Sequence, residues 1–530
     1  MNTIRWYPCK FTWALLLLIL SAAIQTRANA QEQPQGPFIS PSEMPHKTKV
    51  RLMVEAHPEK NGRWDTLPFH MPINPVHVAM MRTGKVLIVS GSGNDPDNKN
   101  LQAAVWDPKT LTIKTFKISW DMFCNGMVIL PDGKPFVIGG TLKYDPFLGE
   151  PKAATFDPAT EIFTDTPDMG ATQGRWYPTG TVLSNGSVLV YSGLINTIVP
   201  GETSARVNTS VQIWTGGTWT AAGTAFMSVQ LYPRQHLLPN GKIFESGSNR
   251  DSQMYDPATK AFAFVANTIF DKRRDYGTSV LLPLTPENGF KPKVMIMGGS
   301  PLDIPQDATD TTELIDLSVP APKWVAGPAM VKGRIELNAT ILPNGKVLVS
   351  GGSVKDEDKA TAVKEAQLYD PANNMFSSAS SMEFPRLYHS NTMLLPDATV
   401  VSLGGNPVRK VYQPEIEIYS PPYLFNSDGS PAKRPTITDV APGELHYGEQ
   451  FNVSTPEAEN IKFIVLIRAG AVTHAFDMDQ RLVGLTFAAV GGVLQATAPA
   501  NGNLAPPGYY LLFILDKEGV PSMAQFVHLS

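Results

Sequence analysis

The amino-acid sequence predicts an all-β protein, a seven-bladed β-propeller followed by a C-terminal immunoglobulin-like β-sandwich. Three observations predict this fold. Only 17% of the 530 residues are charged, while 42 glycines and 46 prolines are spread along the chain. A strand–turn–strand segment recurs seven times at a spacing of about fifty residues. After residue 430 this repeat stops, and apolar segments follow at irregular spacing. Such a chain is typical of many short strands joined by turns.

The repeated segment is clearest in Leu342–Gly352, which reads Leu-Pro-Asn-Gly-Lys-Val-Leu-Val-Ser-Gly-Gly. Each copy joins two apolar runs through a turn, which is the pattern of a β-hairpin. Asp-Pro pairs between the copies predict a second hairpin in each unit. The other copies are 82–91, 130–140, 183–193, 238–247, 282–299 and 395–405. A period of about fifty with a terminal Gly-Gly resembles the kelch repeat, whose units are four-stranded blades around a channel.

Changes of pattern predict the domain boundaries. Residues 1–30 have the pattern of a signal peptide, in which Arg5 and Lys10 precede a short apolar run and Ala28-Asn29-Ala30 is the cleavage site. Residues 31–430 are predicted to form the propeller with an N-terminal extension, and Met53–Trp64 is the candidate for the strand that closes the ring. Residues 431–530 are predicted to form the sandwich. Its expected strands are Phe451–Val453, Ile461–Ile467, Leu482–Phe487 and Tyr509–Leu515.

The signal peptide predicts export to the periplasm, the cell surface or the medium, with no membrane span after cleavage. Removal of its three basic residues changes the formal charge from −4 to −7, so no basic field favours nucleic acid. Cys124 is then the one cysteine of the mature chain, which is unusual for an exported protein. A lone cysteine is either a buried, inert thiol or part of a covalent bond.

One position of the repeat carries chemically functional side chains. This position lies nine residues before the turn glycine, or before the residue in its place. The residues found there are Pro75, Cys124, Tyr177, Tyr232, Tyr276, Glu336 and His389. Equivalent positions of a propeller lie on a ring around its axis, because each blade repeats the same geometry. Ordinary packing would favour Val, Ile or Ala, so we expect a functional ring.

Imidazole and phenolate favour Cu(II), which prefers tetragonal nitrogen and oxygen coordination. His389 and Tyr177 offer one of each, and Tyr388 stands next to His389. His474 lies between two expected sandwich strands, in a turn that could reach the channel. Cys124 and Tyr177 belong to neighbouring blades, so a thioether between them would remove the odd thiol. From the residues alone, Tyr177 could also be a packed aromatic, and Tyr388-His389 could be a turn pair.

The segments around these residues resemble the galactose oxidase and glyoxal oxidase family of copper-radical oxidases, with the glyoxal oxidase branch closer. They are Phe123–Gly126, Arg175–Thr179, Arg386–Ser390, Thr473-His474 with Met478–Leu482, Pro421–Leu424 and Pro507–Tyr510. The resemblance implies that Cys124 is crosslinked to Tyr177, which carries the radical and binds copper equatorially. It makes His389 and His474 the other equatorial ligands, and Tyr388 the axial ligand and general base.

One departure concerns the radical. Members of the galactose oxidase type place a shielding tryptophan about eighteen residues after the radical tyrosine, where this chain has Ile195. This difference argues against a preference for galactose.

The resemblance implies a secreted oxidase that converts a small aldehyde, as its hydrate, to a carboxylic acid and reduces O2 to H2O2. Its cofactors would be one copper ion and the thioether radical. The alternatives are a primary alcohol or galactose-type sugar oxidase on the same site, or a non-catalytic glycan-binding propeller. Tyr232, Tyr276 and Glu336 are the candidates for a substrate funnel. We expect a monomer that acts on its substrate and O2, with an extracellular peroxidase or a surface glycan as a further partner.

Overall fold

The computed structural model describes residues 51–52, 57–225, 229–301 and 307–530. The signal segment 1–30 and most of the N-terminal extension lie outside the described residues. Strands predominate in the described part, where the helical elements are α1 (Pro58–Asn61) and four 3-10 turns. No helix within these ranges is long and apolar enough to cross a membrane.

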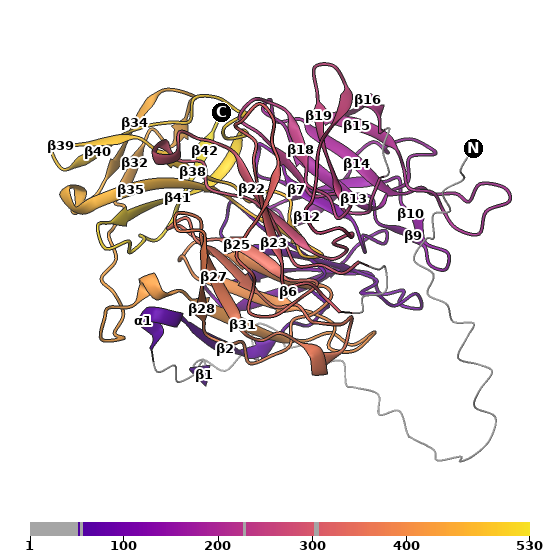
Figure 1. Ribbon diagram of the computed structural model, residues 1–530, viewed down its shortest axis with the longest axis horizontal. Helices are drawn as coiled ribbons and strands as arrows, with labels where there is room; N and C mark the ends of the chain where they lie inside the picture. Colours follow the sequence, from indigo (N-terminus) through magenta and orange to yellow (C-terminus); the bar gives the residue numbers. More distant parts are fainter. Residues whose placement is uncertain (1–50, 53–56, 226–228, 302–306) are drawn as a thin grey trace, which may run out of the picture. The chain divides into compact units, whose positions relative to one another are not determined.

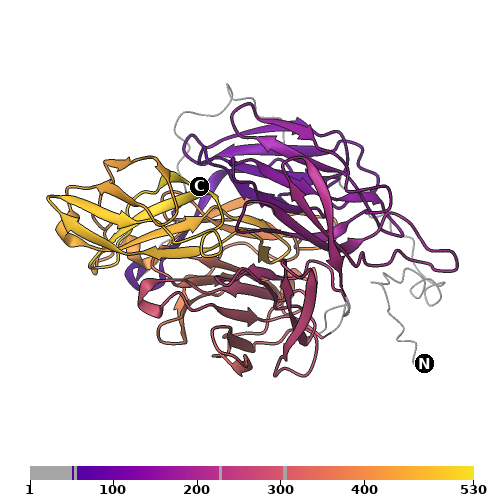
Figure 2. The same cartoon turned by 90° about the horizontal axis from the view of Figure 1, so that it is seen from above.

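Seven antiparallel sheets form the blades of the propeller, which confirms the predicted fold (Figures 1 and 2). The first two blades contain β3 (His77–Met80), β4 (Val86–Gly91), β5 (Gln102–Asp107) and β6 (Thr112–Lys117), and then β7 (Gly126–Ile129), β8 (Pro135–Ile138), β11 (Ala153–Asp157) and β12 (Ile162–Asp165). A separate hairpin of β9 (Thr141–Lys143) and β10 (Leu148–Gly149) lies in the sequence between β8 and β11.

The next four blades each use four consecutive strands. They are β13 (Trp176–Val182), β14 (Val188–Leu194), β15 (Ser210–Thr215) and β16 (Thr218–Thr224); β17 (Gln235–Leu237), β18 (Ile243–Glu245), β19 (Asp251–Asp256) and β20 (Ala261–Asn267); β21 (Thr278–Leu281), β22 (Lys293–Met297), β23 (Thr312–Asp316) and β24 (Trp324–Ala326); and β25 (Asn338–Ile341), β26 (Val347–Ser350), β27 (Ala366–Asp370) and β28 (Met375–Ala379).

The last blade is closed by an N-terminal strand. It contains β29 (Ser390–Leu394), β30 (Val400–Gly404) and β31 (Glu415–Ser420), followed by β2 (Arg63–His70) and the short β1 (Arg51–Leu52). The antiparallel register pairs Arg63 with Ser420. The closing strand therefore starts at the end of the predicted segment Met53–Trp64, because Pro58 begins the helical turn α1 there.

The turn glycines of the repeat have a common conformation. Their φ angles are 79° at Gly84, 81° at Gly133, Gly186 and Gly241, and 80° at Gly345. In the second blade, Gly133 donates its N–H to the Leu130 carbonyl at 2.9 Å. A left-handed residue that ends such a turn lets the two strands pair with their natural twist. Ala398 takes the same place with φ 63°, a conformation that glycine would adopt at lower cost.

The C-terminal strands form two sheets, as expected for a sandwich (Figure 1). One contains β32 (Asp439–Ala441), β34 (Gln450–Ser454), β40 (Val493–Thr497) and β39 (Phe487–Val490), and the other contains β33 (Glu444–Leu445), β42 (Gln525–Leu529), β41 (Gly508–Asp516), β35 (Ile461–Arg468) and β38 (Leu482–Leu485). Three of the four strand segments predicted here lie within single strands, whereas the predicted segment Leu482–Phe487 is divided at Thr486 between β38 and β39, which belong to different sheets. Buried apolar side chains of both sheets belong to one core cluster, which also includes blade residues such as Phe244 and Val294.

A hairpin of the C-terminal region leaves these two sheets and joins the propeller. Its strands are β36 (Ala471–Thr473) and β37 (Phe476–Asp477), and β36 pairs antiparallel with β3, the inner strand of the first blade. In this register His77 lies opposite Thr473. The hairpin therefore brings His474 to the inner strands of the blades, as the sequence suggested.

A buried arginine recurs in four blades and ties each inner loop to the end of the second strand. Its guanidinium donates to a backbone carbonyl in every case: Arg175 to Ser192, Arg274 to Gly298, Arg334 to Gly351 and Arg386 to Gly404. In the last blade the Arg386 guanidinium also binds the Glu417 carboxylate at 2.8 Å, and both side chains are fully buried. The arginines that precede the site tyrosines thus have structural partners.

Removing Arg386 should destabilise the protein strongly. We expect Arg386→Met to lower the free energy of unfolding by about 3–5 kcal/mol, because the Glu417 carboxylate would stay buried without its cation. Denaturant unfolding measures this loss. The control is Arg206→Met, whose pair with Glu202 is exposed and whose removal should cost less than about 1 kcal/mol. If both variants lost the same free energy of unfolding, the stabilising role of the buried Arg386–Glu417 pair would be contradicted.

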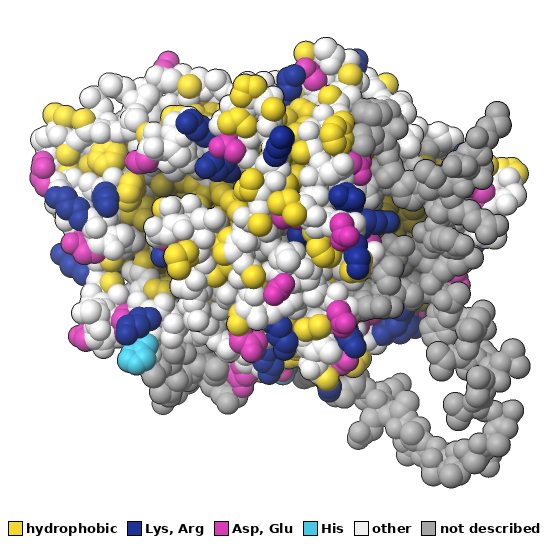
Figure 3. All heavy atoms as spheres, viewed as in Figure 1, with side chains coloured by type: hydrophobic (Ala, Val, Ile, Leu, Met, Phe, Trp, Pro, Cys, Tyr) yellow, Lys and Arg dark blue, Asp and Glu magenta, His cyan; other side chains and the backbone are white. Residues whose placement is uncertain are grey.

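Charged side chains of both signs are mixed on the face drawn in Figure 3, where Lys and Arg side chains lie among Asp and Glu side chains. This distribution agrees with the small formal charge of −4 and shows no basic stripe on that face.

Candidate metal centre

The six functional residues of the repeat position share one unusual backbone conformation. Their positive φ angles are 62° at Cys124, 69° at Tyr177, 45° at Tyr232, 57° at Tyr276, 59° at Glu336 and 66° at His389. The left-handed region costs a residue with a side chain about 1–2 kcal/mol. Pro75 cannot adopt it, because its ring holds φ negative. The shared conformation shows that these positions of the repeat are structurally equivalent, and such strain is concentrated at functional sites.

Backbone hydrogen bonds connect several members of this ring. Tyr177 donates its N–H to the Cys124 carbonyl at 3.0 Å, and Tyr232 donates to the Tyr177 carbonyl at 2.9 Å. Glu336 donates to the Tyr276 carbonyl at 2.7 Å in the same way. Each bond joins neighbouring blades at the inner end of the first strand. The ring residues are therefore held at fixed spacing by main-chain atoms.

His474 has a defined tautomer. The Thr473 hydroxyl donates to the Val76 carbonyl at 3.1 Å and lies 2.6 Å from His474 Nδ1. Because a hydroxyl has one proton, we assign the proton of the second bond to Nδ1, which leaves a lone pair on Nε2. Burial holds the pKa of His474 well below its usual range, with His389 and His77 nearby adding to the effect. The imidazole is therefore neutral at physiological pH.

His389 has the same tautomer by the same kind of argument. Its Nδ1 lies 2.8 Å from Asn406 Oδ1, while the amide nitrogen of Asn406 donates to the Val411 carbonyl at 2.9 Å. The Nδ1 therefore carries the proton, and the buried Nε2 has no hydrogen-bond partner in the described chain. Burial lowers the pKa of His389 to about 3. A second neutral imidazole thus offers a free lone pair.

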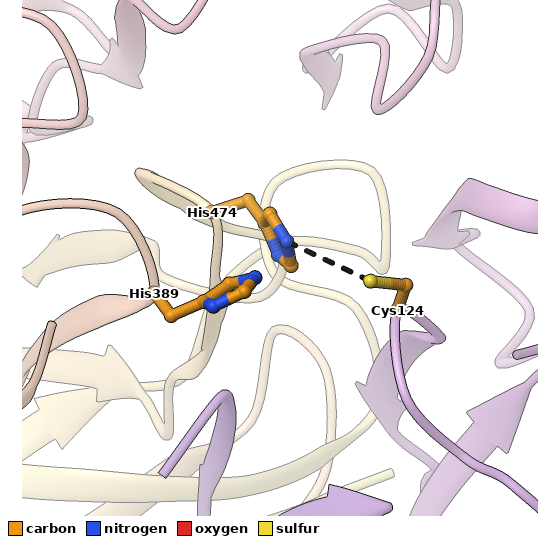
Figure 4. Close-up of side chains that lie close together, drawn as sticks. All are labelled: Cys124, His389 and His474. Atoms are coloured by element: carbon orange, nitrogen blue, oxygen red, sulfur yellow. Dashed lines mark hydrogen bonds between the residues drawn. The ribbon is translucent and has the colours of Figure 1, made fainter. Parts of the chain in front are cut away.

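These two imidazoles and the Cys124 thiol lie together (Figure 4). Potential ligand atoms of Cys124, His389 and His474 are all within 4.8 Å of one another. Cys124 Sγ is 4.0 Å from His474 Nε2. Among the described residues, no other group of three His, Cys, Asp or Glu side chains meets this criterion. The three come from the loop before β7, the loop before β29 and the turn of the β36–β37 hairpin.

Two phenols complete the cluster. The hydroxyls of Tyr177 and Tyr388 are in contact with each other. The Tyr177 ring centre is 4.6 Å from that of His474, and the Tyr388 ring is stacked on His389 at 3.8 Å. Burial is the main cause that raises the pKa of both phenols, and the proximity of Cys124 adds to it. Without a cation nearby, both hydroxyls stay protonated at neutral pH.

The cluster fits the metal that the sequence predicted. The unpaired Nε2 of His389, the Nε2 of His474, which contacts the Cys124 thiol, and two phenol oxygens form the mixed nitrogen and oxygen donor set that Cu(II) prefers. The Cys124 thiol is fully buried and in contact with Tyr177, and burial raises its pKa. A protonated thiol held against a phenol ring is placed for the predicted crosslink. The thioether and the individual ligand roles stay predictions.

The three funnel candidates differ in their surroundings. Tyr232 is stacked on Tyr177 at 4.4 Å, and its hydroxyl donates to the Asn125 carbonyl at 2.7 Å. The Tyr276 ring meets the Tyr388 ring edge-on at 6.2 Å. Glu336 is 4% exposed, and the backbone N–H of Tyr388 lies near its carboxyl group. Burial raises the pKa of Glu336. Tyr232 packs against the Tyr177 ring, and the funnel role of all three residues stays a prediction.

Sequence reasoning missed Trp176. Its ring is stacked on Tyr177 with centres 3.8 Å apart and planes at 10°, and Phe147 is stacked on its other side at 4.4 Å. The family resemblance places a shielding indole where this chain has Ile195, but here Trp176, directly before the tyrosine, covers the ring. Strand neighbours normally point to opposite faces. Tyr177 has a left-handed backbone conformation, which breaks this alternation. Only the motif Arg175-Trp176-Tyr177 could therefore have indicated that Trp176 stacks on Tyr177.

His77 is a second residue that the sequence analysis did not assign to the site. It is fully buried, its Nε2 accepts the backbone N–H of Cys124 at 3.0 Å, and its ring is 5.8 Å from that of His474. Nothing in the sequence distinguishes it from a packed core histidine.

Comparisons with known proteins agree with this geometry. Residues 93–423 match the family model "Glyoxal oxidase N-terminus", and residues 434–529 match "Galactose oxidase-like, Early set domain". An aldehyde oxidase GLOX of Vitis pseudoreticulata is 29% identical, over 88% of this chain and 97% of that protein. A galactose oxidase of Gibberella zeae is 27% identical, over 88% of this chain and 71% of that protein.

A solved structure is also similar. A fungal alcohol oxidase of the AA5 family, in complex with copper, superposes with a TM-score of 0.77 at 25% identity. The match covers 88% of this chain and 99% of that one.

The two imidazoles should control metal binding. We expect His389→Ala and His474→Ala each to lower Cu(II) affinity by at least about tenfold, because each variant removes one free lone pair from the centre. Titration of copper-free protein, with the electron paramagnetic resonance spectrum of bound Cu(II), measures this. The control His446→Ala removes an exposed imidazole bonded to Ser530 and should leave the affinity unchanged. Tight binding by both site variants would refute the assignment.

Proposed function

The chain belongs to the glyoxal oxidase family of copper-radical oxidases, and we propose that it oxidises a small aldehyde, as its hydrate, to the carboxylic acid. The same turnover reduces O2 to H2O2, so that hydrate and O2 give acid and peroxide in equal amounts. The observation that carries the proposal is the convergence of two neutral imidazoles, two phenols and a thiol from distant segments. The similarity to aldehyde oxidases along most of the chain supports an aldehyde substrate.

Tyr177, Tyr388, His389 and His474 would hold the copper ion. Copper would supply one of the two one-electron acceptors that the oxidation needs, and would make a bound substrate hydroxyl more acidic. Tyr388 would take that hydroxyl proton on its phenol oxygen. Tyr177, conjugated with the Cys124 sulfur, would supply the second one-electron acceptor and take a hydrogen atom from the substrate carbon.

The aromatic surroundings suit a reactive phenol. Tyr177 is 7% exposed, with Trp176 stacked on it at 3.8 Å and Tyr232 at 4.4 Å. Such packing keeps water and reductants away from an oxidised ring. Ile195 offers no indole to shield Tyr177, but the stacked Trp176 ring covers it and so supports the proposal.

A primary alcohol or a sugar is the second candidate substrate for the same centre. The similarity to a galactose oxidase and to a fungal alcohol oxidase favours this alternative. The chemistry of the residues would be the same, because an alcohol also presents a hydroxyl and a carbon-bound hydrogen. A glycan-binding role without catalysis would not require two buried, neutral imidazoles beside two phenols.

Export is part of the proposal. The pattern of residues 1–30 supports cleavage after Ala30 and action in the periplasm, on the cell surface or in the medium. A monomer that supplies H2O2 to an extracellular peroxidase, or that modifies surface glycans, would fit such a location.

A substrate panel tests the function. Copper-loaded protein should release H2O2 with glyoxal and methylglyoxal, and much less with galactose. Tyr388→Phe should lower kcat/KM by about 10²–10⁴-fold, because it removes the proton acceptor. The control Tyr369→Phe removes a hydroxyl that donates to Asn374 between β27 and β28 and should keep the activity. Higher activity with galactose would favour the sugar oxidase, and no H2O2 with any substrate would refute the oxidase.

The crosslink gives a separate measurement. Exposure of copper-free, reduced protein to Cu(II) and O2 should lower the intact mass by about 2 Da and remove the alkylatable thiol, because the thioether forms with loss of two hydrogens. Cys124→Ser should keep its mass. A Cys124 that stays fully alkylatable would contradict the thioether.

A further inference from the structure

The hydrogen bond of the Cys124 backbone departs from the pattern of the ring. Tyr177, Tyr232 and Glu336 each donate their N–H to the carbonyl of the preceding ring residue. Cys124 follows Pro75, but its N–H donates to the side chain of His77, with 3.0 Å between the two nitrogens.

The proline explains the departure. Its ring holds φ near −65°, so Pro75 lacks the left-handed conformation of the other ring members. Its carbonyl accepts a hydrogen bond from the amide nitrogen of Asn391 on β29. Cys124 therefore lacks the main-chain acceptor that fixes three of the other ring residues, and the His77 imidazole takes that place.

The hydrogen bond defines the state of His77. An imidazole nitrogen that accepts an N–H has a lone pair, so the proton of the ring is on Nδ1. Nδ1 has no hydrogen-bond partner in the described chain, and the side chain is fully buried. A buried polar group without a partner destabilises the folded state, so such a residue is kept where it has a function.

His77 also pairs with β36, the strand that precedes His474. Its backbone pairs with Thr473 across β3 and β36, and Thr473 hydrogen-bonds His474. One residue thus positions Cys124 through its side chain and the turn with His474 through its main chain. These two parts of the site are about 350 residues apart in the sequence.

We propose that His77 is a positioning residue for the Cys124–Tyr177 crosslink, and this rests on the proposed function. It holds Cys124 in the left-handed conformation that places its sulfur beside the Tyr177 ring. In the reaction the S–H bond and one ring C–H bond break and a C–S bond forms. The two protons and two electrons released go to O2, which becomes H2O2, in the presence of Cu(II).

Two variants place a hydrogen-bond acceptor at different positions of the His77 side chain. His77→Gln puts a carbonyl oxygen near the position of Nε2, and His77→Asn puts one near the position of Nδ1. We expect crosslinking in His77→Gln at nearly the wild-type rate, and crosslinking in His77→Asn slowed about tenfold or more. The rate is followed by intact mass and by alkylation of Cys124 after Cu(II) is added in air. Equal rates in the two variants, fast or slow, would overturn the proposal.

Further measurements separate positioning from folding. His77→Phe removes the acceptor, and His236→Phe is its matched control, because His236 is also buried but hydrogen-bonds Ser279. We expect slow crosslinking only in His77→Phe, with similar Tm and Cu(II) affinity in both variants. Wild-type crosslinking by His77→Phe would refute the role of His77. Failure of the wild-type protein to crosslink would refute the thioether of the proposed function instead.

Discussion

The pairing of β36 with β3 is the interaction on which the site depends. An inner strand of a propeller blade leaves one edge of backbone groups free, and here a hairpin of the C-terminal region takes that edge in the first blade. The hydrogen-bond register sets Thr473 opposite His77, so the next residue, His474, reaches the ring of inner residues. The propeller supplies phenols, a thiol and one imidazole, and only the added strand supplies the second imidazole.

The ring itself combines strain with rigidity. Six residues other than glycine are in the left-handed region, at a cost of about 1–2 kcal/mol each, and the surrounding blades must offset this cost. Backbone hydrogen bonds between blades and buried arginines beneath them provide rigid support. A metal centre needs ligands that are already in place, since a loose set would have to be ordered again when the ion binds.

Burial prepares the chemical state of the donors. Desolvation lowers the pKa of both imidazoles and raises the pKa of both phenols and the thiol. The imidazoles thus offer lone pairs at neutral pH without competition from protons. The phenols and the thiol stay neutral until a cation compensates the charge. The same low-dielectric environment that makes charge costly without the metal would strengthen its binding to phenolate oxygen.

The repeat in the sequence was sufficient to predict seven blades and the ring that includes Cys124, Tyr177 and His389, because equal spacing implies equal backbone geometry. The sequence did not reveal that Trp176 covers Tyr177, since a left-handed residue breaks the alternation of side chains. It also placed the closing strand too early, because Pro58 starts a helical turn there. The tautomers of His389 and His474 and the contact of His77 with Cys124 depend on groups far away in the sequence. Periodicity determines which residues are equivalent, whereas only the folded chain decides which atoms of distant segments meet.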